Sequence, residues 1–84
     1  MNPQKKLLTS LILQMMKEVY LKTVGLEALF HTNMIHIFKQ DFNPYVELLL
    51  ALELSDEEST HFSNKVQQYL EEQIDLDQLI TSLP

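Results

Sequence analysis

Residues 44–54, PYVELLLALEL, are the segment that most constrains how this chain can fold. Nine of these eleven residues are apolar, and the exceptions are Glu47 and Glu53. As a helix the segment is about 16 Å long, which is too short to span a bilayer. The two glutamates lie about 120° apart around such a helix, so it has no clean polar side. We therefore expect the other helices to pack around this segment, within one chain or across two.

Helix start signals lie on both sides of this segment. Before it, Asn43 can cap a helix that has Pro44 at its first position. After it, Ser55 and Glu58 have the spacing of a capping box, and acidic residues fill the first turn between them. A second box with the same spacing begins at Asp75. These signals predict three consecutive helices with short connections.

Gly25 is the only glycine of the chain and interrupts a long helical pattern in its first half. Glycine is the residue that most easily adopts the left-handed conformation at a helix end, so we expect the first helix to end near residues 22–24. A kink in one continuous helix is the alternative. No segment shows the alternation of a strand. The sequence predicts a single all-α domain over residues 1–84, a bundle of helices at about 3–23, 26–40, 44–54, 56–73 and 76–83.

Apolar residues recur at helical spacing within each predicted helix. The first helix is apolar over about half of its circumference, which suggests contact with two neighbours. The methionines on this face are typical of an adaptable binding surface, although Met is also a common core residue. The residues that we assign to the core or to a dimer seam are Leu8, Leu11, Ile12, Met15, Val19, Phe30, Met34, Phe38, Leu48, Leu49, Leu52, Phe62, Val66 and Leu70.

The apolar surface is large for a chain of this size. The chain has 84 residues, of which 45% are hydrophobic, and a domain this small buries roughly 60–65% of its unfolded surface. One bundle of this size has thin walls around a helix that is apolar on every side. We therefore expect part of the apolar surface to meet another chain, most simply as a homodimer.

The charge distribution excludes one class of partner and suggests another. The net charge is −6, and all six basic residues are Lys. A protein with no Arg and an acidic total lacks the main electrostatic contribution to nucleic-acid binding, so we expect no nucleic-acid ligand. Residues 1–42 carry +2 and residues 43–84 carry −8. This difference favours either complementary packing of the halves or an acidic surface for a basic protein. The candidate residues of that surface are Glu57, Glu71, Glu72, Asp75 and Asp77.

No pattern of residues indicates chemistry. His31 and His36 are five residues apart and point to different sides of a helix, whereas metal pairs on a helix need a spacing of three or four. The paired acids are explained by helix termini or lie on polar faces, and catalytic carboxylates need a pocket that shifts their pKa values. The absence of cysteine excludes thiolate sites and fits a reducing compartment. We expect no enzyme activity, no cofactor and no metal site.

The first sixteen residues combine a basic start with an apolar run, as a signal peptide does. The run breaks into KEVYLK and contains Thr, Ser and Gln, so we interpret it as the first helix, with no membrane span. The sequence thus predicts a cytoplasmic, non-enzymatic protein-interaction module (a regulator, adaptor, chaperone or immunity protein) that binds a partner protein as a homodimer. The alternatives are a membrane- or lipid-associated helical protein that uses the first helix, and an acidic mimic of nucleic acid.

Overall fold

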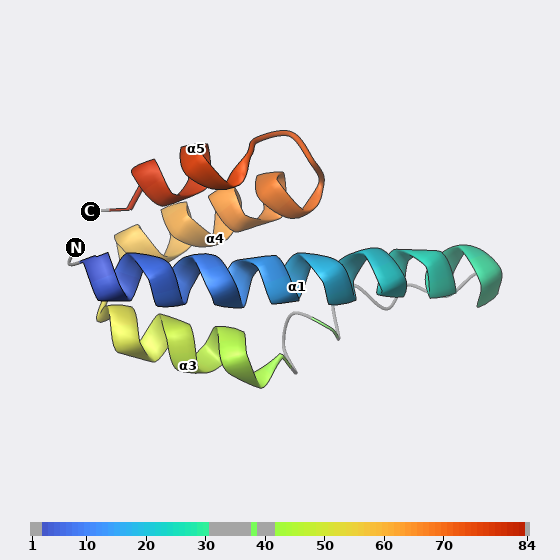
Figure 1. The fold of residues 1–84 in the computed structure, drawn as a ribbon, viewed down its shortest axis with the longest axis horizontal. Helices are drawn as coiled ribbons and strands as arrows, with labels where there is room; N and C mark the ends of the chain where they lie inside the picture. Colours follow the sequence, from blue (N-terminus) through green and yellow to red (C-terminus); the bar gives the residue numbers. More distant parts are fainter. Residues whose placement is uncertain (1–2, 31–37, 39–41, 84) are drawn as a thin grey trace.

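The structure is a computed structural model that describes residues 3–30, 38 and 42–83. The described residues form the helices α1 (Pro3–Phe30), α3 (Asn43–Leu52), α4 (Asp56–Leu70) and α5 (Leu76–Thr81), and they form no strand. Figure 1 shows α1 along the whole length of the molecule, with α3 on one side and α4 and α5 on the other. The all-α bundle that the sequence predicts is confirmed.

The helix α1 continues through Gly25, so the expected end near residues 22–24 is wrong. Gly25 does not adopt a positive φ, and the helix runs on to Phe30. The neighbouring residues explain this outcome, because Leu, Lys, Glu and Ala are strong helix formers and one glycine costs about 1 kcal/mol in a helix interior. Of the separate helix expected over 26–40, the first five residues belong to α1, and 31–37 and 39–41 lie outside the described residues.

The helix α3 is shorter than expected at its C-terminus. Phe42 is its N-cap residue and makes no side-chain capping bond, so the expectation that Asn43 caps the helix is wrong; Pro44 does lie in the first turn, as expected. The helix ends at Leu52 because Glu53 adopts the left-handed conformation, with φ at 51°, and its N–H bonds the carbonyl of Leu50. After this turn the chain reaches Ser55, which has an extended conformation and is the N-cap residue of α4.

Both predicted capping boxes are present. The Glu58 N–H donates to Ser55 Oγ at 3.2 Å, and the Ser55 N–H donates to Glu58 Oε1 at 3.0 Å. At the start of α5 the Gln78 N–H donates to Asp75 Oδ1 at 2.8 Å, and the Asp75 N–H donates to Gln78 Oε1 at 2.9 Å. Each box satisfies backbone donors that a helix start otherwise leaves unpaired.

Two helices end earlier than the predicted bounds of 73 and 83. The helix α4 ends at Leu70 in a Schellman motif with Glu72 in the left-handed conformation, at a φ of 62°. Its two bonds run from the Glu72 N–H to the Tyr69 carbonyl, at 3.1 Å, and from the Gln73 N–H to the Gln68 carbonyl, at 2.8 Å. The sequence gives no warning of this end, because glutamate stands where such motifs usually have glycine. The helix α5 ends at Thr81.

The central helix is α1, and not the apolar helix α3. α1 packs against each of α3, α4 and α5. It is 28 residues long, whereas α3 has ten residues and buries Tyr45 and Leu48. Leu50 of α3 is 75% exposed, so the described helices of one chain do not surround this segment, and the expectation is wrong for a single chain. The other form of the expectation, packing across two chains, stays a prediction. Length explains the outcome, because a helix of about 42 Å can line three shorter ones.

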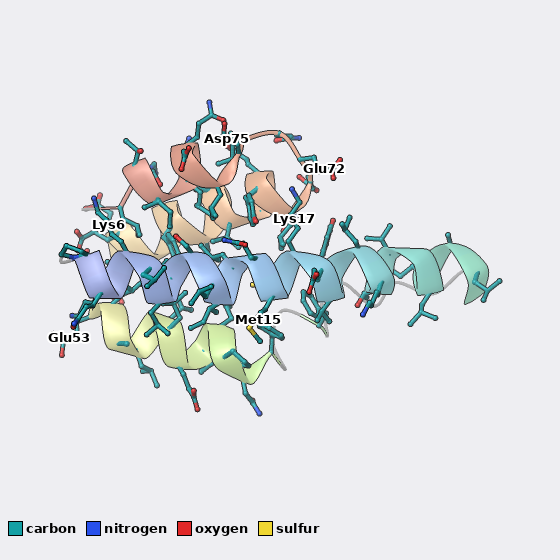
Figure 2. The ribbon with its side chains drawn as sticks, viewed as in Figure 1. Lys6, Met15, Lys17, Glu53, Glu72 and Asp75 are labelled. Atoms are coloured by element: carbon teal, nitrogen blue, oxygen red, sulfur yellow. The ribbon has the colours of Figure 1, made fainter. Side chains whose placement is uncertain are left out.

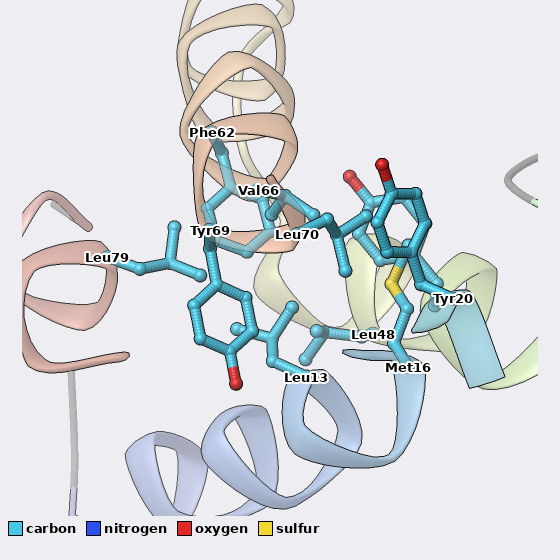
Figure 3. Packing of buried hydrophobic residues seen from close by; sticks show 10 residues of the cluster. Leu13, Met16, Tyr20, Leu48, Phe62, Val66, Tyr69, Leu70 and Leu79 are labelled. Carbon is cyan, nitrogen blue, oxygen red and sulfur yellow. The ribbon is translucent and has the colours of Figure 1, made fainter. Parts of the chain in front are cut away.

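The core lies where α1, α3, α4 and α5 meet. Figure 3 shows side chains of α1 and α4 meeting in this cluster, with Leu79 entering from α5. Among the described residues Thr9 is the one buried residue classed as polar, and its Oγ1 donates to the Lys5 carbonyl at 2.7 Å. The buried hydrophobic residues are Leu13, Met16, Tyr20, Tyr45, Leu48, Phe62, Val66, Tyr69, Leu70 and Leu79.

The residues assigned to the core or a dimer seam divide into three groups. Leu48, Phe62, Val66 and Leu70 are buried in the core. A second group, Ile12, Phe38, Leu49 and Leu52, is partly buried against it. The other assigned residues of α1 are exposed, namely Leu8, Leu11, Met15 and Val19. Met34 and the side chain of Phe30 lie outside the described parts of the structure.

Candidate interaction surface

One side of α1 is apolar and has no described helix packed on it. Leu13, Met16 and Tyr20 face the core, whereas Leu11 and Met15 are half exposed on another side of the same helix. This surface, which we call the free face of α1, consists of Leu7, Leu8, Leu11, Met15, Val19, Leu21, Leu26 and Leu29. At the helical period these residues share one side, away from the residues that contact α4.

Two charged residues lie within the free face. Glu18 and Lys22 are exposed, and their positions around the helix fall between those of Leu21 and Met15. Lys17 marks the border toward α4, because its Nζ lies 4.6 Å from the centre of the Tyr69 ring in a cation–π contact. Figure 2 shows Lys17 and Met15 projecting from opposite edges of this face, Lys17 toward α4 and Met15 toward α3.

The free face is hollowed on its α4 side. A groove of about 520 Å³ lies along α1 and reaches the ring of Tyr69. Burial raises the pKa of the Tyr69 phenol, so this hydroxyl is neutral at physiological pH. The lining residues are Leu11, Gln14, Met15, Lys17, Glu18, Leu21 and Tyr69. The groove therefore offers a mostly apolar floor with a few polar groups at its edge.

The predicted acidic surface divides into two places. Glu71 and Glu72 occupy the turn between α4 and α5, and Asp75 begins α5 with Asp77 in its first turn. Glu57 lies at the other end of α4, about 21 Å from Glu71 along the helix. All five side chains are exposed. The structure thus brings four of the five predicted residues together at one end of the bundle.

Several of these acids have local partners. Glu71 Oε1 accepts a hydrogen bond from Gln67 Nε2 at 2.9 Å, and Asp75 caps α5. Burial raises the pKa of the Tyr20 phenol, and the negative charges of Glu71 and Glu27 raise it further. The acidic group therefore contributes to helix termini as well as to the electric field at this end of the molecule.

A second hollow, of about 270 Å³, lies where the start of α4 meets the end of α5. Its lining residues are Glu57, Glu58, His61, Phe62, Ser82 and Leu83. Glu58 is held by the capping box, which keeps the pKa of its carboxyl below the ordinary value. Among the described residues no three His, Cys, Asp or Glu side chains are placed to hold a metal ion, and His31 and His36 lie outside them.

The sequence interpretation missed the continuity of the free face across Gly25. It assigned Leu26 and Leu29 to a separate helix, so their alignment with Leu8 and Leu11 was not considered. The signal was present in the spacing, because Leu8, Met15, Lys22 and Leu29 follow one another at intervals of seven. The expected break at the glycine hid this repeat.

The fold and the surface define a class, a small all-α bundle with one apolar helix face left open. No helix in residues 3–30 or 42–83 is both long enough and apolar enough to cross a membrane. No family model matches the sequence, and no curated protein or solved structure is significantly similar to it.

Proposed function

We propose that this protein is a cytoplasmic, non-enzymatic protein-interaction module that acts as a homodimer and binds a partner protein. The observation that carries the proposal is the free face of α1, where eight apolar side chains keep about half of their surface exposed. They expose on the order of 400 Å² if one aliphatic side chain has about 100 Å² of apolar surface. Contiguous patches of this size on small proteins commonly mark interaction sites.

The acidic end of the bundle suggests the charge of the partner. Glu71, Glu72, Asp75 and Asp77 are exposed around the α4–α5 turn, and the whole chain carries −6. A field of one sign speeds association with a protein of the opposite sign and disfavours acidic competitors. The proposed division of roles is that the free face of α1 makes the apolar contact of the homodimer and the α4–α5 turn attracts a basic partner protein.

A second candidate function is binding to a membrane surface. The helix α1 carries four Lys and two Glu, so it has a positive charge in an otherwise acidic protein. An apolar face with Lys at its borders is the pattern of helices that lie in the bilayer interface. Against this candidate, Glu18 lies within the face itself and no Arg is present.

A photoreactive amino acid in place of Leu11 tests the proposed function in the native cell. We expect crosslinks to protein, either to this chain or to another. Asn64, which is exposed on α4 away from this face, is the matched control position and should give few crosslinks. Crosslinks to lipid, together with binding to anionic vesicles, would support the membrane candidate and overturn the proposal.

A further inference from the structure

We infer that the free face of α1 binds the same face of a second copy, with the two helices antiparallel and the two-fold axis at the level of Tyr20. The inference deepens the proposed function by naming the occupant of its main surface. The face has a seven-residue repeat in which Leu8, Met15, Lys22 and Leu29 form one row. Leu11, Glu18 and Gly25 form the second row of the same repeat.

The two rows match each other when one helix is reversed. In an antiparallel pair the residues of one row meet those of the other row on the partner helix. With the axis at residue 20, Leu11 meets the partner's Leu29, and Glu18 meets the partner's Lys22. Each contact occurs twice by symmetry. Between Leu11 and Leu29 the match therefore joins apolar to apolar residues and negative to positive ones.

Gly25 has a role in this arrangement. An added Cβ at Gly25 would meet nothing within 4 Å among the described residues of the monomer, and Gly25 does not adopt a positive φ. Neither the backbone conformation nor packing against the described residues of its own chain therefore requires glycine here, although glycine weakens a helix. In the antiparallel pair Gly25 lies opposite the partner's Met15, where a small residue gives the longer side chain space. The proposed dimer therefore gives a reason for glycine at position 25.

The flanking positions agree with the same axis. Val19 lies beside the axis on one edge of the seam and Leu21 on the other, so each meets its own copy. A parallel pair would instead place Lys22 against the partner's Lys22 and Glu18 against the partner's Glu18, which is repulsive. Charge thus selects the antiparallel direction.

The available area also suits a dimer. Burial of both free faces removes on the order of 800 Å² of apolar surface at about 100 Å² per fully exposed aliphatic side chain. If polar residues at the rim add about one third of the buried surface, the interface reaches about 1,200 Å². This area is the lower end of the range for stable protein–protein interfaces. In Figure 1 α1 extends past the ends of α3, α4 and α5, so none of these three helices covers its C-terminal end.

Charge reversal tests the register by sedimentation equilibrium at low salt. We expect Glu18→Lys and Lys22→Glu each to weaken self-association at least tenfold, because each creates two like-charged contacts. The double variant should associate nearly as well as the wild type. An equimolar mixture of the two single variants should form a heterodimer, since one chain is then basic at both positions and the other acidic. Circular dichroism should show equal helix content throughout.

Several outcomes would overturn the inference. A monomeric wild type, unchanged association of the single variants, or a double variant no better than either single variant would each exclude this register. If these outcomes appear while the photoreactive residue at position 11 still captures a different protein, the partner-binding part of the proposed function stands, and the proposed self-pairing of α1 fails. If position 11 captures lipid instead, both fail.

Discussion

Met15 and Met16 are adjacent in the chain and face opposite environments: Met16 is fully buried in the core, and Met15 is 54% exposed on the free face of α1. A step of about 100° around the helix separates them. Met16 belongs to the same core cluster as Phe62 and Val66, while Met15 lines the groove beside Lys17 and Tyr69. One residue is therefore needed for the fold, and its neighbour is available for binding.

Alanine substitutions should separate these two roles. We expect Met16→Ala to lower the free energy of unfolding by about 2–5 kcal/mol, because it leaves a cavity in a small core. Met15→Ala should change it by less than about 0.5 kcal/mol in the monomer, as is usual for an exposed site. Urea denaturation at low protein concentration measures both. Equal losses for the two variants would contradict the assigned burial.

The capping box of α4 should make stability depend on acid pH. Hydrogen bonds from Ser55 hold the pKa of Glu58 below its ordinary value. A lowered folded-state pKa contributes stability above the unfolded value of about 4.3, and this contribution is lost as the pH falls through the folded value. Glu58→Gln keeps the geometry of the box but cannot titrate. Its unfolding midpoint should fall less steeply between about pH 5 and pH 2 than that of the wild type.

The first residue of this box offers a simpler measurement. Ser55→Ala removes the acceptor for the Glu58 N–H and should cost about 1 kcal/mol of stability. Ser59→Ala is a matched control, since Ser59 follows one turn later within α4. Thermal unfolding followed by circular dichroism compares the two. A loss for Ser59→Ala as large as that for Ser55→Ala would argue against a specific capping effect.

Alkaline pH should destabilise the core through its tyrosines. Burial raises the pKa of Tyr45, whose hydroxyl lies 3.3 Å from Ser63 Oγ, and burial also raises the pKa of Tyr20 and Tyr69. The folded-state pKa lies above the unfolded value of about 10, so this stability is complete below about pH 10 and is lost as the pH rises through the folded value. Tyr45→Phe should reduce the alkaline decline in the free energy of unfolding. Titration of the phenols by ultraviolet absorbance should show ionisation above the ordinary value in the wild type.

Gly25 should respond in opposite directions in the monomer and the dimer. Gly25→Ala should stabilise the isolated helix by up to about 1 kcal/mol, and an added Cβ meets none of the residues that the structure describes. The same methyl group should weaken self-association, because it occupies the space proposed for the partner's Met15. Dilution series followed by circular dichroism and sedimentation measure the two effects. Stronger self-association in Gly25→Ala would contradict the proposed contact.

Local chemistry at helix starts was predictable from the sequence, whereas the choice of central helix was not. The boxes at Ser55 and Asp75 depend on residues three apart, so the pattern determines them directly. The apolar segment 44–54 was predicted to be the central helix of the bundle. Apolar content does not show which helix is long enough to contact all the others, and that helix is α1. The second half of α1 was not predicted as part of the first helix, because Gly25 was expected to end that helix. The strong helix formers around Gly25 outweigh its weak preference for a helix end.

The candidate interaction surface was predictable only in part from the sequence. Leu8, Leu11, Met15 and Val19 were identified as apolar, but periodicity alone does not say which side of a wide stripe meets the core. Packing resolves this, because Leu13, Met16 and Tyr20 face α4 and leave the other side open. The acids near the α4–α5 turn were identified by composition, and Glu57 was grouped with them although it lies at the far end of α4.

The mass of the protein in solution tests the central claim, that the free face of α1 is covered by another copy. Static light scattering at micromolar concentration should give twice the 9.9 kDa of one chain. Leu11→Glu, which places a charge opposite the partner's Leu29, should return the mass to that of one chain with unchanged helix content. A wild-type mass of one chain at high micromolar concentration would contradict the account.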